Sequence, residues 1–144
     1  MTALIKSYHI KKRDFIRAGE ASINVQNLLK SLSFDSNLIR RVAICGYEGE
    51  MNVVMHGGDG LLSVEINSGK IVMVISDNGA GIEDIDLAMR KGFSTASDEY
   101  RKMGFGAGMG LPNMKKNADI FNIESEKGKG TEVRMIFSMR KEGG

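Results

Sequence analysis

The chain has 144 residues, about the size of one domain, and its 20 basic and 18 acidic residues leave a net charge of only +2. This balance argues against a nucleic-acid or membrane surface. The longest apolar runs, such as residues 71–75, are too short to cross a bilayer, and the N-terminus does not resemble a signal peptide. The single cysteine, Cys45, fits a reduced, cytoplasmic setting.

The first half of the chain predicts one strand and two helices. Residues 2–10 alternate enough for a strand, and residues 18–33 carry apolar side chains at helical spacing. Asp35 or Ser36 offers an N-cap for a second helix from about residue 37 to residue 56. The glycines of residues 57–60 end that helix.

The second half predicts two hairpins around a loop. "LLSVEI" and "KIVMVIS" flank the turn "NSGK", and "IFNIES" and "TEVRMIFSM" form the last hairpin. "GIEDIDLAM" and "LPNMKKNA" predict short helices, the latter with Pro112 in its first turn. Residues 90–110 show little periodicity, which is typical of a functional loop. We therefore expect a single α/β domain over residues 1–144, a two-layer sandwich with helices on one face of a mixed, largely antiparallel sheet.

The second predicted helix places two polar residues beside its buried stripe. At about 100° per residue the stripe contains Leu38, Val42, Cys45, Gly49, Val53 and His56. Glu48 and Asn52 fall along its edge between apolar flanks, where an unpartnered polar group costs about 1–3 kcal/mol. A bound ligand would supply the partners. From this helix alone, an exposed face or ordinary buried hydrogen bonds is the simpler explanation of the pair.

A second candidate site follows the apolar strand "IVMVIS". The strand ends in Asp77, with Gly79 and Gly81 two and four residues later. Asp-Asn-Gly is strong turn chemistry, so a plain turn is one interpretation. The functional interpretation is a buried carboxylate that accepts from an amino group, with the glycines letting a flat ligand approach the backbone.

A third candidate site is the glycine-rich segment "MGFGAGMGLPNM" directly before a predicted helix. Its alternating glycines are Gly104, Gly106, Gly108 and Gly110. They leave N–H groups free to face phosphates, and the helix N-terminus adds partial positive charge. The polar "SDEYRK" upstream excludes a dinucleotide fold, and the Gly-Lys-Ser/Thr of a P-loop is absent. Arg101 and Lys102 are candidate phosphate contacts, and a flexible surface loop is the alternative.

Together these segments resemble the nucleotide-binding boxes of the GHKL, or Bergerat-fold, ATPase superfamily. Glu48 and Asn52 resemble its N-box, and Asp77, Gly79 and Gly81 its G1 box. The glycine-rich segment from Gly104 to Leu111 resembles its G2 box, and Gly130–Thr131 resembles the Gly-Thr before its last strand. Their order and spacing agree over residues 35–139, with the ATP lid at about residues 90–110.

Within the superfamily, the chain most resembles the bacterial anti-sigma factor and serine-protein kinase group. Histidine kinases carry a dimerisation helix pair that bears the phosphorylated histidine, whereas His9 lies in a predicted strand. Gyrase, chaperone and mismatch-repair members need further domains. "GAGMGLPNMKKNADIFNIES" is similar to the switch kinases of this group, whose lid runs into Gly-Leu-Pro. The resemblance implies phosphorylation of Ser or Thr on a STAS-domain anti-sigma-factor antagonist with Mg-ATP.

The resemblance also implies residue roles. Asn52 would coordinate Mg²⁺ through its amide oxygen, and Glu48 would be the general base or would orient the incoming hydroxyl. Asp77, supported by Thr131, would accept from the adenine amino group. Gly79 and Gly81 would let base and sugar approach. The phosphates would contact Arg101, Lys102, Gly104, Gly106, Gly108, Gly110 and Leu111.

Three features of the second helix stand apart from these roles. Glu50 is another acidic candidate, but it points away from Asn52. Gly46 and Gly49 each cost a helix about 1 kcal/mol relative to Ala, and close packing against the sheet would explain Gly49. His56 is assigned to packing rather than catalysis.

Two functions remain open. The leading hypothesis is a protein-serine/threonine kinase in a partner-switching module that controls a sigma factor or a stress response. The alternative is a protein that binds a sigma factor or activates a phosphatase, with ATP as a conformational switch. Glu48 favours the kinase, because a switch needs no base. Related kinases are often homodimers, so the resemblance also implies a dimer.

Overall fold

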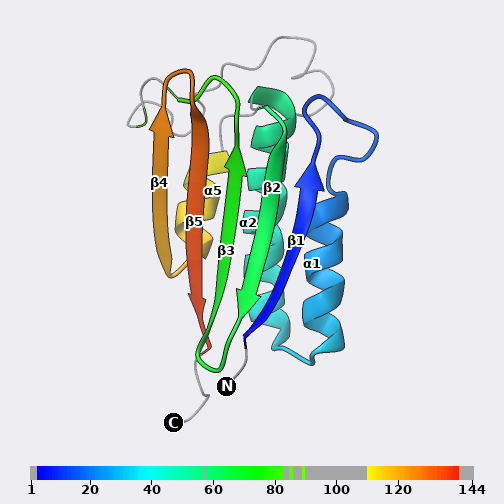
Figure 1. The fold of residues 1–144 in the computed structure, drawn as a ribbon. Coiled ribbons are helices and arrows are strands. Elements are labelled where there is room, and N and C mark those ends of the chain that lie inside the picture. Colours follow the sequence, from blue (N-terminus) through cyan, green and yellow to red (C-terminus); the bar gives the residue numbers. More distant parts are fainter. Residues whose placement is uncertain (1–2, 57, 83–84, 86–88, 90–109, 140–144) are drawn as a thin grey trace.

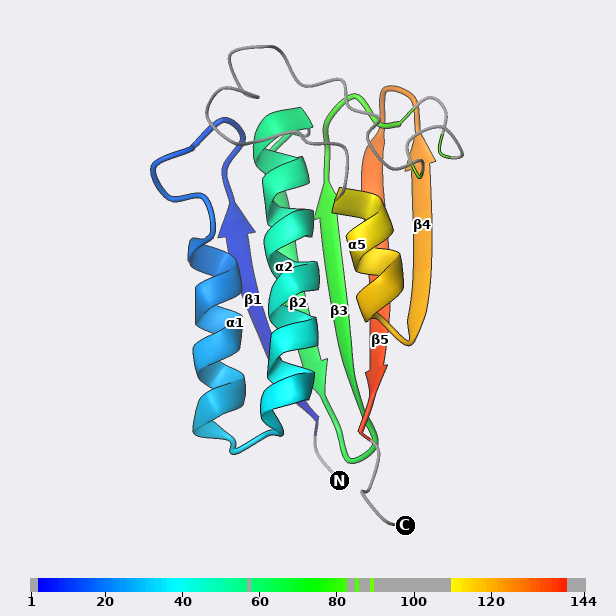
Figure 2. The ribbon, with the colours of Figure 1, turned by 180° about the vertical axis from the view of Figure 1, so that it is seen from behind.

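One sheet carries three helices on one face. The computed structural model describes residues 3–56, 58–82, 85, 89 and 110–139. Within these residues five strands form a single sheet (Figure 1). Seen from behind, helices α1, α2 and α5 lie side by side against it (Figure 2). The expected two-layer α/β architecture is confirmed, and every described strand pair is antiparallel.

The strands lie where alternation and turn residues predicted them. Their order in the sheet is β1-β2-β3-β5-β4. Their bounds are β1 Leu4–Ile10, β2 Gly60–Ile66, β3 Lys70–Asp77, β4 Ile120–Glu126 and β5 Gly130–Ser138. Both expected hairpins are present. Asn67 closes the first one, because its Oδ1 accepts hydrogen bonds from the N–H groups of Gly69 and Lys70.

The helices also match the sequence, with small shifts at their ends. Helix α1 is Glu20–Ser31, shorter than the expected residues 18–33, because Gly19 has φ +96° and ends the helical backbone there. Helix α2 is Ser36–His56 and begins with Asp35 as its cap, since Leu38 N donates to Asp35 Oδ2 at 3.1 Å. Helix α5 is Gly110–Asn117.

The helix expected over residues 81–89 lies mostly outside the described residues. One hydrogen bond of helical spacing is described there, from Met89 N to Ile85 O at 2.9 Å. The ATP lid expected at residues 90–110 lies outside them too, apart from Gly110. Among the described residues, no helix is both long enough and apolar enough to span a membrane.

The core lies between the helices and one face of the sheet. The buried stripe of α2 is confirmed for Leu38, Val42, Cys45, Gly49 and Val53, whereas the side chain of His56 is not described. Cys45 is fully buried, and burial raises the pKa of its thiol to about 12, as expected for a core residue.

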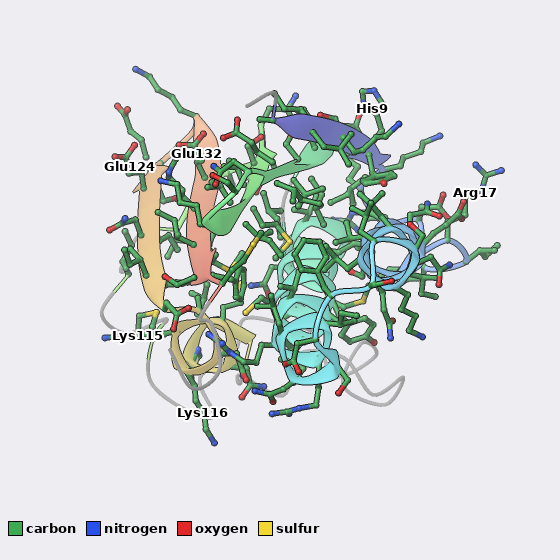
Figure 3. The ribbon with its side chains drawn as sticks, turned by 90° about the horizontal axis from the view of Figure 1, so that it is seen from below. His9, Arg17, Lys115, Lys116, Glu124 and Glu132 are labelled. Carbon is green, nitrogen blue, oxygen red and sulfur yellow. The ribbon has the colours of Figure 1, made fainter. Side chains whose placement is uncertain are left out.

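The other face of the sheet is not covered by any described helix. His9, Glu132 and Glu124 project from it (Figure 3). The strand register places these three residues in one row across the sheet. The fold therefore directs one face to the core and the other to solvent, which is the usual arrangement of an antiparallel sheet packed by helices.

Gly49 is required where α2 crosses the sheet. A Cβ at this position would overlap the terminal methyl group of Ile75 on β3 and lie 3.6 Å from Met114 Sδ on α5. The expected close packing of Gly49 against the sheet is thus confirmed. Because α2 approaches this closely, residues 48–53 lie directly over the ends of β2 and β3.

Candidate active site

Glu48 and Asn52 lie one turn apart on α2 and face the first residue of α5. A Cβ at Gly110 would lie 3.2 Å from Glu48 Oε2 and 3.3 Å from Asn52 Oδ1. Glycine leaves this space open, so the carboxylate and the amide face the backbone at the N-terminal end of α5. The N–H groups and the dipole of a helix N-terminus favour an anion at such a place.

Burial changes the electrostatics of Glu48. The side chain is half-buried, and burial raises the pKa of its carboxyl above the ordinary value. A side-chain hydrogen bond with Asn113 of α5 opposes part of this rise. A carboxylate with reduced solvation and few partners is a better proton acceptor than one in water. Glu48 therefore has the environment of a general base.

Asp77 ends β3 beside two other strands. The register pairs it with Gly60 of β2 and Thr131 of β5. Its Oδ1 accepts hydrogen bonds from Gly79 N at 2.8 Å and Gly58 N at 3.4 Å, which is the turn that Asp-Asn-Gly predicts. Within the described residues its Oδ2 accepts no hydrogen bond. The turn and the ligand interpretations are thus compatible, because each uses a different oxygen.

The loop after Asp77 is fastened to the β4–β5 turn. Ile82 N donates to Ser125 Oγ at 2.6 Å, and the hydroxyls of Ser125 and Thr131 lie 2.8 Å apart. Gly128 N donates to the carbonyl of Ala80 at 2.7 Å. Gly81 has φ +82°, and a Cβ there would collide with the backbone of β4 at Glu126. This loop needs glycine both for its conformation and for its close approach.

The two halves of the site meet because α2 packs on the sheet at Gly49. One turn further, Val53 contacts Gly60, the register partner of Asp77: a Cβ on Gly60 would lie 2.9 Å from Val53 Cγ1 and 3.4 Å from Asp77 Cβ. Glu48 and Asn52 therefore lie on the part of α2 that covers the Asp77 end of the sheet. Five predicted residues, Glu48, Asn52, Asp77, Gly110 and Thr131, surround one region.

Glu50 has a different role from Glu48. It is only 2% exposed and accepts hydrogen bonds from Gly19 N, Ala21 N, Ser22 N and Ser22 Oγ at 2.7–3.2 Å. These donors belong to the first turn of α1, which has no side-chain cap of its own. Glu50 therefore caps α1 from α2 and points away from Asn52, as the helical spacing predicted.

The sequence interpretation missed the roles of three residues that shape this region. The capping role of Glu50 could have been found because "RAGEAS" offers no Ser, Thr, Asp or Asn at the α1 N-cap, so the N–H donors of α1 need a partner elsewhere. Asn113, which bonds to Glu48, and Ser125, which holds the loop after β3, gave no comparable signal. Their roles depend on contacts between segments far apart in the chain.

Several predicted phosphate contacts lie outside the described residues. These are Arg101, Lys102, Gly104, Gly106 and Gly108. Leu111 is described, and its side chain is 7% exposed and belongs to the core, so only its backbone is available to a ligand. Gly79 is described in the turn that Asp77 shapes.

The region of Asn52 offers few side-chain ligands for a metal ion. Among the described residues, no group of three or more His, Cys, Asp or Glu side chains could hold one. Asn52 offers a single amide oxygen beside the space that glycine leaves open at position 110. One hard oxygen ligand fits Mg²⁺ that is held mainly by phosphates and water.

Known proteins resemble this chain both in sequence and in fold. The family of histidine kinase-, DNA gyrase B- and HSP90-like ATPases matches residues 37–141. The structure is similar to a mycobacterial sensor histidine kinase, MprB, with a TM-score of 0.54 at 14% identity, covering 94% of this chain and 97% of that one. At this identity the structural likeness shows the fold alone.

Two sequence relatives are more similar. The serine/threonine-protein kinase RsbT of Bacillus subtilis (strain 168) is 32% identical over 119 residues, which cover 80% of this chain and 84% of RsbT. The anti-sigma F factor of Thermoanaerobacter sp. (strain X514) is 39% identical over 93 residues, 61% of this chain and 62% of that protein. The matched family region contains all the described site residues, and the chain belongs to the histidine kinase-, DNA gyrase B- and HSP90-like ATPases.

Proposed function

We propose that this chain is an ATP-dependent protein-serine/threonine kinase that phosphorylates a STAS-domain antagonist in a partner-switching module. The observation that carries the proposal is the environment of Glu48. This carboxylate is half-buried, has one described hydrogen-bond partner and faces the N-terminus of α5 beside Asn52. The likeness to RsbT, which is named a serine/threonine-protein kinase, supports the same activity.

The described residues divide between base recognition and phosphate chemistry. Asp77 Oδ2 would accept from the adenine amino group, and the Thr131 hydroxyl would support it from the neighbouring strand. Gly79 and Gly81 would let the base and sugar lie against the loop after β3. The N–H groups at Gly110 and Leu111 would face the phosphates. The glycines and cations of residues 101–108 would make further contacts with the phosphates.

Bound ATP would supply the γ-phosphoryl group, and Mg²⁺ would neutralise the charge that develops during transfer. Asn52 would hold the ion through its amide oxygen. Glu48 would accept the proton of the incoming serine or threonine hydroxyl, and Asn113 would fix the carboxylate that does so. A positioned base of this kind contributes about 10²–10⁴-fold to a rate.

A second candidate function comes from the likeness to anti-sigma F factors. In that case the chain would bind a sigma factor or activate a phosphatase, and ATP would act mainly as a conformational switch. Such a role can coexist with phosphorylation of an antagonist. Glu48 separates the two activities, because a purely conformational role does not require a base beside the phosphates.

The direct test is transfer of labelled phosphate. The purified chain is incubated with Mg²⁺, γ-labelled ATP and a candidate STAS-domain antagonist from the same genome, and the product is analysed by mass spectrometry. We expect phosphate on one serine or threonine of the STAS protein. No transfer, with ATP binding intact, would overturn the kinase proposal and leave the binding protein.

Asp77→Asn tests the adenine assignment separately. Asparagine keeps an Oδ1 that can accept from Gly79 N, so the turn is preserved. It replaces the second oxygen with an NH₂ group, which cannot accept from the adenine amino group. We expect ATP affinity to fall about tenfold or more, measured by calorimetry. Unchanged affinity would show that Asp77 does not recognise the base.

A further inference from the structure

A groove lies between α1 and α2 and ends at the proposed catalytic base. Its volume is about 680 Å³, and its lining residues come from both helices and the segment that connects them. Glu48 belongs to this lining. Figure 2 shows the two helices side by side on the sheet along this length. Glu48 therefore belongs both to the lining of the groove and to the proposed active site beside α5.

The walls of the groove are unusually apolar for an exposed surface. Ile23 of α1 is 56% exposed and Tyr47 of α2 is 44% exposed, and both line it. The Tyr47 ring also covers the N-terminal end of α1, since a Cβ on Gly19 would lie 3.6 Å from its Cε1. Exposed isoleucine and tyrosine on facing helices are typical of a protein-binding surface.

The two ends of the groove carry opposite charges. Lys30, in the last turn of α1, and Arg40, in the second turn of α2, line the end far from Glu48. Both cations are exposed, and no ion pair within the described residues is formed by either one. A partner that fits this groove therefore carries acidic side chains at the Lys30–Arg40 end.

The spacing along α2 sets the size of the bound segment. Arg40 and Glu48 are separated by eight helical residues, which corresponds to about 12 Å. A segment lying along the groove would place an acidic side chain at Arg40 and a hydroxyl at Glu48 with the same separation. A small phosphoacceptor would not use both ends, so a protein segment is the occupant that the geometry favours.

We propose that the α1–α2 groove is the docking site for the phosphoacceptor protein. The apolar centre, with Ile23 and Tyr47, holds an apolar side chain of the partner, and Lys30 and Arg40 pair with its acidic residues. The serine or threonine then lies about 12 Å away, at Glu48. This inference rests on the proposed kinase function, because it takes Glu48 as the end at which the hydroxyl is delivered.

Glu50 keeps this docking site in shape. The four hydrogen bonds that its carboxylate accepts fix the first turn of α1 to α2, and Gly19 and Ser22, which donate three of them, also line the groove. The distance between the two walls is therefore set by a buried carboxylate rather than by surface contacts. The groove is preformed, which lowers the cost of ordering on binding.

The test measures binding and transfer on the same variants. The probe is the STAS-domain protein used in the transfer assay, whether or not it becomes phosphorylated. The variant is Lys30→Glu with Arg40→Glu. The control is Lys116→Glu, which reverses an exposed charge in the last turn of α5, across α2 from α1 (Figure 3). Circular dichroism and ATP affinity establish that each protein is folded.

We expect the double variant to bind the STAS protein at least about tenfold more weakly, with ATP affinity unchanged and the control like wild type. This result supports the groove even if no phosphate is transferred, in which case only the kinase proposal fails. Transfer by wild type with binding unaffected by the double variant would overturn the groove alone. A wild-type chain that neither binds nor phosphorylates the probe would count against both.

A photo-crosslinking residue locates the contact without relying on charge reversal. It is placed at Ile23 in the groove and, as a control, at Ile120, which is 49% exposed on edge strand β4. Crosslinking to the STAS protein from position 23 and not from position 120 is expected. Crosslinking from position 120 alone would place the partner on the sheet and contradict the proposal.

Discussion

Two carboxylates two residues apart on α2 point to opposite sides of the helix, Glu50 toward α1 and Glu48 toward α5. Glu50 is 2% exposed and accepts four hydrogen bonds from the start of α1. Glu48 is half-buried, faces α5 and has a pKa that burial raises. They differ by about 200° around the helix. The residue type is identical, and the number of hydrogen-bond donors around it separates a structural group from a reactive one.

The difference also explains how one helix can be both rigid and functional. Donors from α1 compensate the burial of Glu50, so that side of α2 is fixed. Glu48 and Asn52 lack such compensation within the described residues, apart from the bond of Glu48 with Asn113. Their unused acceptors remain for the nucleotide, its metal ion and the hydroxyl. The hydrogen bonds on the α1 side fix α2 in place, and this also fixes the positions of Glu48 and Asn52 on its α5 side.

The largest change in stability is expected for Glu50→Gln. Glutamine would turn an NH₂ group toward N–H donors of α1 and remove the charge that strengthens the four bonds. We expect the free energy of unfolding to fall by about 3 kcal/mol, measured by urea denaturation. Glu124→Gln, on an exposed strand position, should stay within about 0.5 kcal/mol of wild type. A free energy of unfolding that is unchanged in Glu50→Gln would contradict the capping role.

A smaller loss is expected for Gly49→Ala. The added methyl group would overlap Ile75, which is 3% exposed and has little room to move. Overpacking costs about 1–3 kcal/mol, and the higher helix propensity of alanine offsets about 1 kcal/mol of this. We therefore expect the free energy of unfolding to fall by about 1 kcal/mol.

Gly46→Ala is the matched control in the same helix. Its new Cβ would make only ordinary contacts, 3.4 Å from Ser22 Oγ and 3.6 Å from Met73 Sδ. We expect it to be neutral or up to about 1 kcal/mol more stable than wild type. If both alanine variants behave alike in thermal unfolding, then Gly49 does not set the distance between α2 and the sheet.

The smallest effect, of opposite sign to that of Glu50→Gln, is expected for Glu48→Gln. Because burial raises the pKa of Glu48 in the folded state, folding favours its protonated form. Its contribution to stability is full below the unfolded pKa and is lost as the pH rises through the folded one. Glu48→Gln should therefore be slightly more stable than wild type at pH 7, and the difference should shrink with falling pH and vanish below the pKa of glutamate in the unfolded chain, about 4.3. Lower stability at pH 7 would contradict this account.

The sequence predicted most of the fold because its signals were local. Alternation gave the strands, helical spacing gave the buried stripe of α2, and Asp35 marked its beginning. The glycine at position 49 already indicated close packing. The beginning of α1 was placed two residues early, because the left-handed conformation of Gly19 cannot be read from an apolar pattern.

The site was predictable where spacing along one segment defined it. Glu48 and Asn52 share a helix edge, and Asp77 ends an apolar strand. Asn113 and Ser125 were missed because their partners lie 65 and 43 residues away, at Glu48 and Ile82. The capping role of Glu50 was missed for the same reason. Contacts of that kind appear only once the packing of α1, α2 and α5 is known.

The most direct test measures phosphate transfer by the two glutamine variants together. Single-turnover transfer to the STAS protein is followed at saturating Mg-ATP and at a temperature where both variants are folded. We expect Glu48→Gln to lose at least about 100-fold in rate with ATP affinity nearly unchanged. Glu50→Gln should keep transfer within about fivefold once the folded fraction is considered. Transfer at the wild-type rate by Glu48→Gln would contradict the assignment of Glu48 as the catalytic base.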